Sequence, residues 1–420
     1  MALHYTTIFL ISLGLAQATT PPPSNLIVDV ESYGAIADGT SDNTQAIQSA
    51  VAALRTGQTL YFPCSTGHYY SVSSPINFGH LNSMQIMGSG PGCFLYYQGA
   101  VAQPYAFSFV GAQFINITNM AFSSAMSGAN PEVVLLLGRT APSVASGHFR
   151  INGVSVQGYA TQALVYSIAS EENAWLQPTL NLNGGGARYV FYTSGSDDLG
   201  VANLPSSSNL SLWMQNFQVC DYSPNIDSTH VLIYDNGNAS SSGSHTYHDG
   251  YLASKNGTAF AFYSNGAGAI AWLSLSVEGN RFESGYQMFY FGGSGSFGDI
   301  ILANNKTASV TNYMIDLPTT CYNCTFQANV VEQGNTAVSQ FGVLQDSFLS
   351  ENYPFTVGKV INSTVINRAL GTLQISSAAS TAACSSVAEG TMRYLPGSGS
   401  RNGSFQICQL QAGTYSWVTH

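Results

Sequence analysis

The pattern of apolar and polar positions predicts one helix near the start of the chain, followed by a long series of strands. Ser41 or Asp42 is placed to N-cap the helix, and Gln45, three residues after Asp42, resembles the far end of a capping box. Gly57 is placed to end it. The apolar residues between these signals recur at helical spacing: Ala46, Ile47, Ala50, Val51 and Leu54. We therefore expect one amphipathic helix between two strands, with an apolar face that covers another part of the fold.

Beyond the helix, short segments rich in Ile, Val, Leu, Phe and Tyr recur and are separated by Gly, Asn and Ser. No second helical stripe is comparably clear. The segments are Phe114–Phe122, Phe149–Val156, Ser211–Val219, His230–Tyr234, Ala271–Val277, Asp299–Ala303, Thr325–Val331 and Lys359–Ile366. Short strands at regular spacing are typical of a sandwich or barrel. The spacing here favours the coils of a solenoid instead.

A series of asparagines supports the solenoid. Its members are 20 to 25 residues apart: Asn216, Asn236, Asn256, Asn280, Asn305, Asn329 and Asn352. One per coil, they would stack at the strand spacing of about 4.8 Å and form a hydrogen-bonded ladder. Asn256 and Asn305 also begin N-x-S/T sequons, and a buried ladder residue cannot carry a glycan. One of the two interpretations must therefore fail at each of these positions.

The start of the chain also resembles a known family. The motifs that carry the resemblance are Tyr33-Gly34-Ala35, Asp38-Gly39, Ser41-Asp42-Asn43-Thr44, Ala46-Ile47, Tyr61-Phe62-Pro63, Val72–Ile76 and Ile86–Gly90. Together they resemble the N-terminal signature of the pectate-lyase-like superfamily, in the rhamnogalacturonase/epimerase-like branch related to the repeats of fungal exo-β-1,3-glucanases. The resemblance implies an all-β, single-stranded right-handed parallel β-helix and a bias toward glycan substrates. It covers roughly the first 95 residues and carries no catalytic residue.

The two ends of the chain differ from its middle. An apolar run followed by Ala16-Gln17-Ala18 predicts a secretory signal peptide, residues 1–18, and so a secreted, extracellular protein. Residues 19–380 would form the β-helix with its N-terminal capping helix. Residues 381–420 would form a disulfide-closed β-hairpin that caps the C-terminal end, since an exposed terminal coil is an aggregation edge. A small glycan-binding appendage is the alternative for this tail.

Composition narrows the partners. Only 8% of residues are charged and the net charge is −10, against roughly 25% charged in average proteins. This balance argues against nucleic acid as a partner and disfavours strongly polyanionic glycans. No run is long enough for a transmembrane helix, so no membrane partner is expected. We expect a polysaccharide partner and no cofactor, or Ca²⁺ if the reaction is a lyase reaction; the oligomeric state stays open.

The seven cysteines predict disulfides in an exported chain. Pairing neighbours in sequence joins Cys64 to Cys93, Cys321 to Cys324 and Cys384 to Cys408, and leaves Cys220 over. The Cys321-x-x-Cys324 spacing could also be half of a redox or metal site.

Eight sequons predict a glycoprotein, although a chain rich in Asn, Ser and Thr produces sequons by chance. They begin at Asn116, Asn209, Asn238, Asn256, Asn305, Asn323, Asn362 and Asn402. We expect only some of them to be occupied.

Two neighbouring segments concentrate the few charged residues. These are Ser244–Tyr251, with Tyr247, His248, Asp249 and Tyr251, and Trp272–Glu283, with Glu278, Arg281 and Glu283. If Asn256 and Asn280 are equivalent, the segments lie on adjacent coils, with His248 stacked on Trp272. Strand alternation would then point Leu273, Leu275 and Val277 inward, and Trp272, Ser274, Ser276 and Glu278 outward. Asp249 would take an inward position or lie in a bend at Gly250.

These residues fit glycoside hydrolysis, which generally uses two carboxylates. We expect Glu278 to be the acid, with Asp249 or Glu283 as its carboxylate partner. His248 and Arg281 would orient them, Arg281 holding Glu278 or Glu283 ionised. The platforms for sugar rings would be Trp272, Tyr247 and Tyr251.

Each group also has a plainer interpretation. The segment His245-x-x-His248-Asp249 could be a metal site, but no third ligand is identifiable elsewhere in the sequence. Glu278, Arg281 and Glu283 could form a surface ion pair at a turn. Asp197-Asp198 resembles the paired aspartates of polygalacturonases but lacks the surrounding motifs, so a solvated turn is favoured. The other acidic residues are interpreted as surface (Glu171, Glu172), as turn chemistry (Asp235) and as a second-rank candidate in the column of Glu283 (Glu332).

The function predicted from the sequence is a secreted carbohydrate-active enzyme, a glycoside hydrolase that cleaves a neutral or weakly acidic cell-wall polysaccharide by paired-carboxylate catalysis. One alternative is a polysaccharide lyase or epimerase acting on uronates, with His248 or Tyr247 as base; the scarcity of Lys and Arg counts against it. The other is a non-catalytic glycan-binding β-helix. Sugar, linkage, endo or exo action and stereochemistry stay open.

Overall fold

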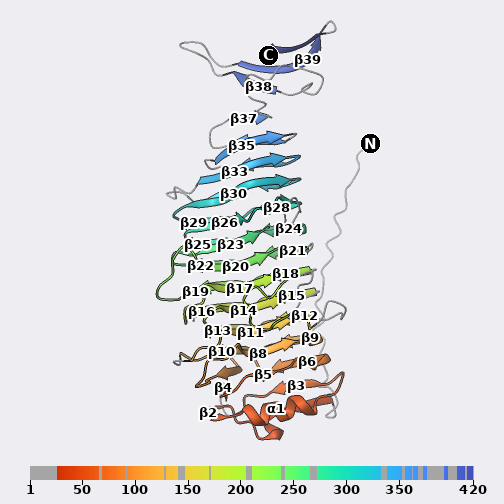
Figure 1. The fold of residues 1–420 in the computed structure, drawn as a ribbon, viewed down its shortest axis with the longest axis vertical. Helices are drawn as coiled ribbons and strands as arrows, with labels where there is room; N and C mark the ends of the chain where they lie inside the picture. The colour runs from red at the N-terminus through yellow and green to blue at the C-terminus, as the bar shows by residue number, and fades with distance from the viewer. Residues whose placement is uncertain are drawn as a thin grey trace, which may run out of the picture.

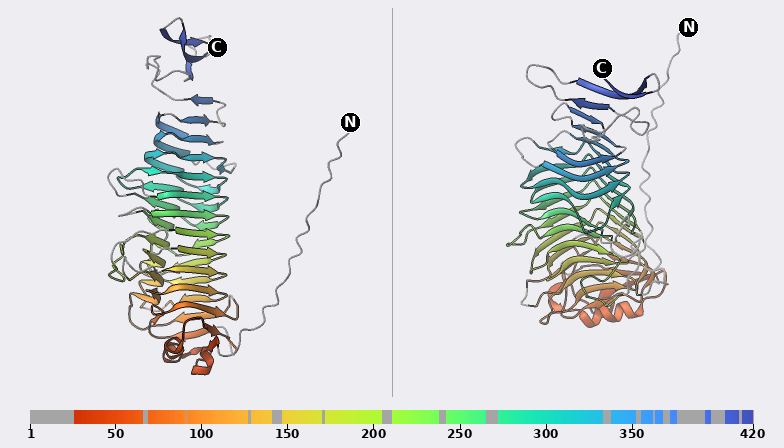
Figure 2. Two further views of the ribbon diagram at one scale, coloured as in Figure 1. Left: turned by 90° about the vertical axis from the view of Figure 1, so that its right-hand side faces the viewer. Right: turned by 45° about the horizontal axis from the view of Figure 1, so that its top comes forward.

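The computed structural model describes most of the chain as one elongated stack of short strands (Figure 1). It describes residues 26–65, 69–90, 92–126, 129–140, 147–169, 172–204, 211–237, 242–264, 272–332, 338–351, 355–361, 363–367, 372–375, 392–395, 404–411 and 414–419. The strands run across the long axis, and the chain winds upward from the helix at one end (Figure 2). The predicted signal peptide lies outside the described residues. Among those described, no helix is long and apolar enough to cross a membrane.

Three long sheets, named here A, B and C, form the walls of the stack. Sheet A contains β1 (Ile27–Asp29), β3 (Thr59–Phe62), β6 (Asn82–Gly88), β9 (Gln113–Thr118), β12 (His148–Asn152), β15 (Glu172–Leu176), β18 (Ser211–Gln215), β21 (Ser242–His248), β24 (Trp272–Glu278), β28 (Ile300–Ala303), β31 (Thr325–Gln327), β34 (Phe348–Glu351), β36 (Thr364–Asn367) and β37 (Thr372–Ile375). Sheet B contains β2 (Asp38–Asp42), β4 (Tyr69–Val72), β7 (Phe94–Tyr97), β10 (Ala121–Ser124), β13 (Ser155–Tyr159), β16 (Thr179–Gly184), β19 (Gln218–Asp221), β22 (Tyr251–Ser254), β25 (Arg281–Gly285), β29 (Lys306–Val310) and β32 (Val330–Val331).

Sheet C contains β5 (Ile76–Asn77), β8 (Tyr105–Val110), β11 (Val133–Gly138), β14 (Ala163–Ile168), β17 (Tyr189–Ser194), β20 (Val231–Asn236), β23 (Thr258–Tyr263), β26 (Gln287–Gly292), β30 (Tyr313–Tyr322), β33 (Val338–Gln345) and β35 (Phe355–Ile361), with β27 (Phe297–Gly298) beside β30. Strands from A, B and C follow one another along the chain, and neighbours in each sheet are parallel apart from the β36–β37 pair. Each circuit of the chain is therefore one coil of a parallel β-helix, and the predicted fold class is confirmed.

The predicted helix is α1 (Thr44–Ala53), and it closes the first coil. Ile47, Ala50 and Val51 are buried on its inner face, and α1 packs against β1, β5 and the short 3-10 helix η2 (Val30–Tyr33). The N-cap is Asn43 rather than Ser41 or Asp42, which lie in β2. The Asn43 amide bonds to the backbone of Ile36. The apolar stripe therefore predicted the helix correctly, whereas the capping-box motif placed the N-cap at least one residue too early.

The interior is a continuous apolar column, because inward positions alternate with outward ones along each strand. A buried polar cluster interrupts it between sheets A and C. Asp235, His245 and Tyr247 are fully buried, and the Asp235 Oδ2 atom lies 2.7 Å from both His245 Nδ1 and the Tyr247 hydroxyl. The sequence interpretation of Asp235 as a turn residue is wrong, since its side chain projects inward from β20 in the same alternating pattern.

An asparagine ladder exists, but it is shorter than the predicted series. Asn280, Asn305 and Asn329 stack at the corner between sheets A and B, each donating its side-chain amide to the next residue at 2.6–3.0 Å. The final acceptor is Glu351 rather than Asn352, which lies outside the described residues. Asn305 is fully buried, so its sequon cannot be occupied in the folded protein.

The earlier asparagines of the series lie elsewhere. Asn216 has a positive φ of 52° in the bend before this corner, Asn236 ends β20 in sheet C, and Asn256 lies in a turn after β22. At the ladder column itself the chain carries Phe217 and Gly250, whose backbone carbonyl groups accept hydrogen bonds from the N–H groups of Tyr251 and Arg281. The column is therefore polar only from Asn280 onward.

Two of the three predicted disulfides are confirmed, Cys64–Cys93 and Cys321–Cys324. Cys220 is free and buried. Cys384 lies outside the described residues, so the third pairing stays a prediction. The tail itself contains a small antiparallel sheet formed by β38 (Met392–Leu395), β39 (Ser404–Gln411) and β40 (Thr414–Thr419).

Candidate functional site

The predicted acid, Glu278, lies on the outer face of sheet A. Leu275 and Val277 of β24 are buried while Ser274, Ser276 and Glu278 are not, so the predicted alternation is correct where it is described. The side chain of Leu273 lies outside the described part. The predicted register is wrong: His248 pairs with Glu278, and Trp272 pairs with Ser242. The coil between β21 and β24 takes 30 residues, from Gly250 to Asn280, because it includes the long connection after β23.

His248, Ser276 and Glu278 form a partly exposed cluster. His248 Nε2 lies 3.1 Å from the Ser276 hydroxyl, which donates to Glu278 Oε1 at 2.5 Å, and His248 Nε2 is 3.6 Å from the same oxygen. The hydroxyl thus bridges an imidazole and a carboxylate. This arrangement fixes the orientation of Glu278 and places a proton donor or acceptor beside it.

The two carboxylates proposed as partners of Glu278 lie at different distances along the coil. Asp249 is a neighbour of Glu278 and donates its backbone N–H to the backbone carbonyl oxygen of Glu278 at 3.0 Å. Glu283 projects from β25 in sheet B, beyond the corner at Gly279–Asn280, and accepts a hydrogen bond from Tyr251. This bond raises the pKa of Tyr251 to about 12. Asp249 is exposed in the bend before Gly250, with a φ of 56°. The structure therefore places Glu278 on sheet A, Asp249 in the bend that follows β21, and Glu283 on sheet B.

Arg281 bonds to a different acid from the ones predicted. Its Nη1 lies 3.1 Å from Glu332 Oε1, and Lys306 Nζ lies 2.7 Å from the same atom. The hydrogen bond from Lys306 lowers the pKa of Glu332. The expectation that Arg281 holds Glu278 or Glu283 is wrong, because parallel in-register pairing aligns β25 with β29 and β32 along one face.

Tyr247 was predicted to be a sugar platform, and this is wrong because its ring is fully buried beside Phe260 in the core. The metal interpretation fails for a related reason. His245 and His248 are an odd number of residues apart on one strand, so they point to opposite faces. No group of three His, Cys, Asp or Glu in the described residues could hold a metal. The side chain of Trp272 lies outside the described part.

Asp197 and Asp198 stabilise a loop on the outer face of sheet C, as the turn interpretation predicts. Asp198 Oδ2 accepts hydrogen bonds from Tyr192, Ser194 and Asn236 at 2.6–2.9 Å. Apolar residues of the loop pack on the sheet C strands β11, β14 and β17, in a second apolar cluster that includes Leu136, Tyr166 and Val201. The described part of the loop therefore covers the lower part of this face.

Above the loop, the same face carries a groove of about 520 Å³ that the sequence reasoning did not identify. Six partly exposed tyrosines line it: Tyr189, Tyr234, Tyr263, Tyr286, Tyr290 and Tyr313. Adjacent rings lie close, with centroids 5.0 Å apart for Tyr189–Tyr234 and Tyr234–Tyr263 and 5.7 Å apart for Tyr263–Tyr290. The available signal was the recurrence of Tyr on successive strands, which in-register pairing turns into a row.

One carboxyl group lies at the upper end of this tyrosine groove. Asp316 of β30 is paired in register with Tyr290 of β26, and only 8% of its surface is exposed. Gln340 donates to its Oδ1 atom at 2.7 Å. Burial raises the pKa of Asp316, which the hydrogen bond from Gln340 only partly offsets. Asp316 is thus poised to carry a proton at a pH where an exposed aspartate has lost it.

A match to a family model covers the first coils. Residues 27–123 match the family described as "Rhamnogalacturonase A/epimerase, pectate lyase-like". The resemblance predicted from the motifs at the start of the chain is therefore confirmed over these residues, which end within β10. No curated protein matches the chain.

Solved structures are similar to this chain only at low identity. The surface adhesin PfbA of Streptococcus pneumoniae has 12% identity and a TM-score of 0.49, over 94% of this chain and 98% of that one. The Agl-KA catalytic domain has 13% identity and a TM-score of 0.48, over 80% and 69%. The Family 28 exopolygalacturonase of Yersinia enterocolitica has 13% identity and a TM-score of 0.43, over 81% and 78%. Likenesses this distant do not indicate an activity.

Proposed function

We propose that the protein is a secreted, carbohydrate-active β-helix that binds a polysaccharide chain in the tyrosine groove of sheet C. The observation that carries the proposal is the row of partly exposed tyrosines that runs along the helix axis and ends at Asp316. Aromatic rings offer apolar surface to the C–H faces of sugars, and their hydroxyl groups bond to sugar hydroxyls. A groove that crosses successive strands suits a linear polymer.

The chemistry of the groove favours a neutral or weakly acidic glycan. Burial raises the pKa of Tyr234, and of Tyr263 to about 12, so these hydroxyls stay neutral donors. Among the described lining residues Arg188 is the one cation and Asp316 the one carboxyl group. A strongly polyanionic chain would find little compensating charge here.

Hydrolysis is the second candidate, and the raised pKa of Asp316 favours it. A protonated Asp316 could donate to the oxygen of a scissile glycosidic bond, the role of a general acid. Paired-carboxylate hydrolysis needs a second carboxylate within about 10 Å, and the described lining supplies one carboxyl group. Binding is therefore the better supported half of the proposal. A lyase on uronates has less support, because the described lining of the groove contains a single cation, Arg188.

The test is a panel of soluble polysaccharides assayed by affinity electrophoresis, with reducing ends and ultraviolet absorbance measured in parallel. We expect retardation by at least one neutral glycan. Tyr234→Ala and Tyr290→Ala should each weaken it up to about 10-fold, since a contact with an aromatic ring contributes roughly 0.5–1.5 kcal/mol and 1.4 kcal/mol is a factor of about 10 in affinity. Tyr33→Ala is the matched control, because Tyr33 is an exposed tyrosine in η2, near the start of the chain, and does not line the groove.

Two acid variants separate the possible reaction sites. If reducing ends appear, Asp316→Asn should abolish them with binding retained, and Glu278→Gln should leave them unchanged. The reverse result would place the acid on sheet A, as the sequence analysis predicts. Unaltered binding by both tyrosine variants would exclude the sheet C groove, and absorbance with reducing ends would indicate a lyase.

A further inference from the structure

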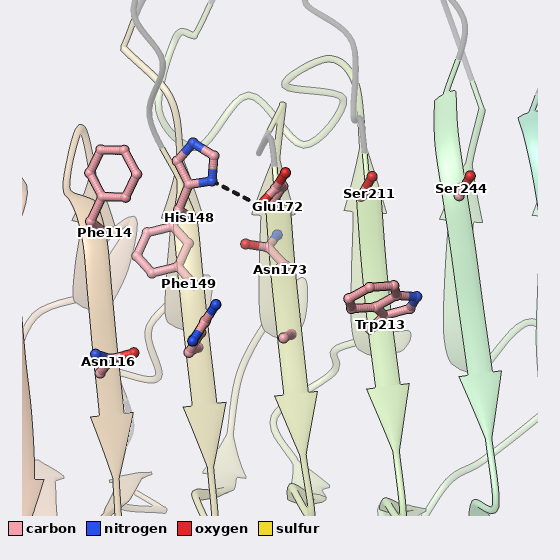
Figure 3. Close-up of a pocket in the computed structure, with 11 residues that line it drawn as sticks. Phe114, Asn116, His148, Phe149, Glu172, Asn173, Ser211, Trp213 and Ser244 are labelled. Atoms are coloured by element: carbon pink, nitrogen blue, oxygen red, sulfur yellow. Dashed lines mark hydrogen bonds and ion pairs between the residues drawn. The ribbon is translucent and has the colours of Figure 1, made fainter.

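The outer face of sheet A carries a second cavity, separate from the tyrosine groove. It has a volume of about 500 Å³ and lies over β9, β12, β15, β18 and β21 (Figure 3). Its lining includes Phe114, Asn116, His148, Arg150 and Trp213. The outward side chains of successive strands stand side by side in it, so a ligand could cross several strands.

Trp213 is the most exposed large aromatic residue of this cavity, at 61% of its surface. Its register neighbours are Ala174 on β15 and Thr246 on β21, and neither side chain is large enough to cover an indole. Exposed apolar area of this size costs free energy in water that a covering group would recover. The indole is thus a platform without a covering side chain.

A second aromatic surface lies at the other end of the cavity. Phe114 and His148 stack with centroids 4.5 Å apart and planes within 5°, and Figure 3 shows both rings projecting from the ends of β9 and β12. His148 Nδ1 lies 3.2 Å from Glu172, which fixes the imidazole in the stack. The two aromatic surfaces therefore border one cavity at opposite ends.

Asn116 begins the sequon Asn116-Ile117-Thr118 and lies in the same row of outward positions as Trp213. The register runs Asn116, Arg150, Ala174, Trp213 on adjacent strands. Three strand spacings separate the ends, or about 14 Å, which is the reach of a few linked sugars. Asn116 is exposed, and no hydrogen bond joins its side-chain amide to another described residue.

We propose that Asn116 is N-glycosylated and that the first sugars of its glycan lie across this cavity from Asn116 over Ala174 to Trp213. The inference is independent of the proposed function and needs only the export predicted from residues 1–18. The sugar is transferred from a lipid-linked pyrophosphate donor. A bond forms between Asn116 Nδ2 and the anomeric carbon, the anomeric C–O bond of the donor breaks, and the amide loses one proton as the lipid pyrophosphate leaves.

The other described sequon residues are less suited to hold an ordered glycan. Asn305 is fully buried. Asn323 donates its side-chain amide to Asp299. Asn256 is partly exposed in a turn after β22 and does not line the cavity. Asn116 thus combines an available amide with an aromatic surface in reach, and Asn256 provides a matched control.

The experiment compares secreted full-length wild type with Asn116→Gln and Asn256→Gln from the same glycosylating host. Peptide mass spectrometry reports occupancy at Asn116. Oxidation of Trp213 by N-bromosuccinimide, mapped on its peptide, reports whether the indole is covered, with the fully buried Trp175 as an unreactive reference. We expect an occupied Asn116, and Trp213 oxidation several-fold faster in Asn116→Gln but unchanged in Asn256→Gln.

Thr118→Ala removes the sequon while retaining Asn116, and it should reproduce the faster oxidation if the glycan is the cause. Thr118→Ser keeps the sequon and should behave as wild type. An unmodified Asn116 would overturn the proposal. So would a glycosylated Asn116 with Trp213 oxidised as fast as in Asn116→Gln. A third outcome would assign the cavity to a free polysaccharide instead. In that outcome the glycan of the wild type does not protect Trp213 from oxidation, but an added soluble glucan does protect Trp213 in Asn116→Gln.

Discussion

At the scale of single residues, this protein places its few ionisable groups in very different environments. Asp316 is nearly buried at the end of the tyrosine groove, whereas Glu332 lies between two cations and Glu278 lies beside a hydroxyl and an imidazole. The environment decides which form of each carboxyl group is favoured. The surroundings of Asp316 favour its neutral form, and those of Glu332 favour its charged form.

This difference predicts a pH dependence of stability. Because burial raises the pKa of Asp316, the native state binds its proton more tightly than the unfolded chain does. The stabilisation is fully present below the usual pKa of an unfolded aspartate and is lost as the pH rises through the native value. Asp316→Asn does not titrate. Measured from about pH 3 to pH 7, the Tm of wild type should therefore fall relative to that of Asp316→Asn; parallel curves would contradict the assignment.

At the scale of secondary-structure elements, the corner between sheets A and B decides how coils are joined. Each ladder residue follows a bend: Gly279 and Asn304 have φ values of 71° and 56° before Asn280 and Asn305. The bend turns the next backbone N–H toward the interior, where the following asparagine accepts it. A residue in the left-handed backbone conformation and the buried asparagine amide that follows it thus act as one structural unit.

Replacing a ladder member should be costly. Asn305 accepts from both Asn280 nitrogens at 3.0–3.1 Å, and its own amide donates to Val277 at 2.7 Å and Asn329 at 3.0 Å. Asn305→Ala leaves several buried groups unpaired, so we expect a loss of about 3–5 kcal/mol in the free energy of unfolding. Asn304→Gly, at the exposed bend, should change it by less than about 1 kcal/mol.

The measurement for both variants is denaturant unfolding followed by circular dichroism. Equal destabilisation by Asn305→Ala and Asn304→Gly would show that the bend, and not the buried amide, holds the corner. A small effect of Asn305→Ala alone would mean that water or backbone rearrangement replaces the lost partners.

The sequence predicted elements better than it predicted alignments between them. The helical stripe, the alternation along β24 and two disulfides were recognisable from local pattern alone. The register was not, because coil length varies: the equivalence of Asn256 and Asn280 fails where the connection after β23 lengthens one coil. That error moved Trp272 onto His248. Neither Asp316 nor the row of tyrosines could be assembled without knowing which strands are neighbours.

At the scale of the whole molecule, the β-helix divides its surface into three faces, and each carries different chemistry. Sheet C carries the tyrosine groove, sheet A carries the Trp213 cavity and the His248–Glu278 pair, and sheet B carries the acid–base network of Arg281, Lys306 and Glu332. One wall can bind a glycan without altering the others. What the three faces share is the stack of coils that supports them, and α1 closes the lower end of this stack.

Loss of this closure should affect the molecule's solubility before its fold. Ile47 is fully buried on the inner face of α1. Ile47→Asp should free the helix, expose the first coil and produce dimers or larger aggregates, because an uncovered sheet edge recruits other chains. Size-exclusion chromatography with light scattering measures this. Gln45→Asp, on the exposed side of α1, is the control and should stay at the mass of wild type. A monomeric Ile47→Asp would show that α1 is dispensable for closure.

The change in the corner column at Asn280 has a consequence for how such a chain can grow. Between Asn280 and Asn329 every coil presents the same acceptor below and the same donor above. A coil copied within this stretch by gene duplication would meet neighbours that already match it, so the length of the stack can increase without new pairing rules. Below Gly250 the column is apolar, and Glu351 has no amide to pass on. Duplication is thus structurally neutral in one segment of the protein and disruptive on either side of it.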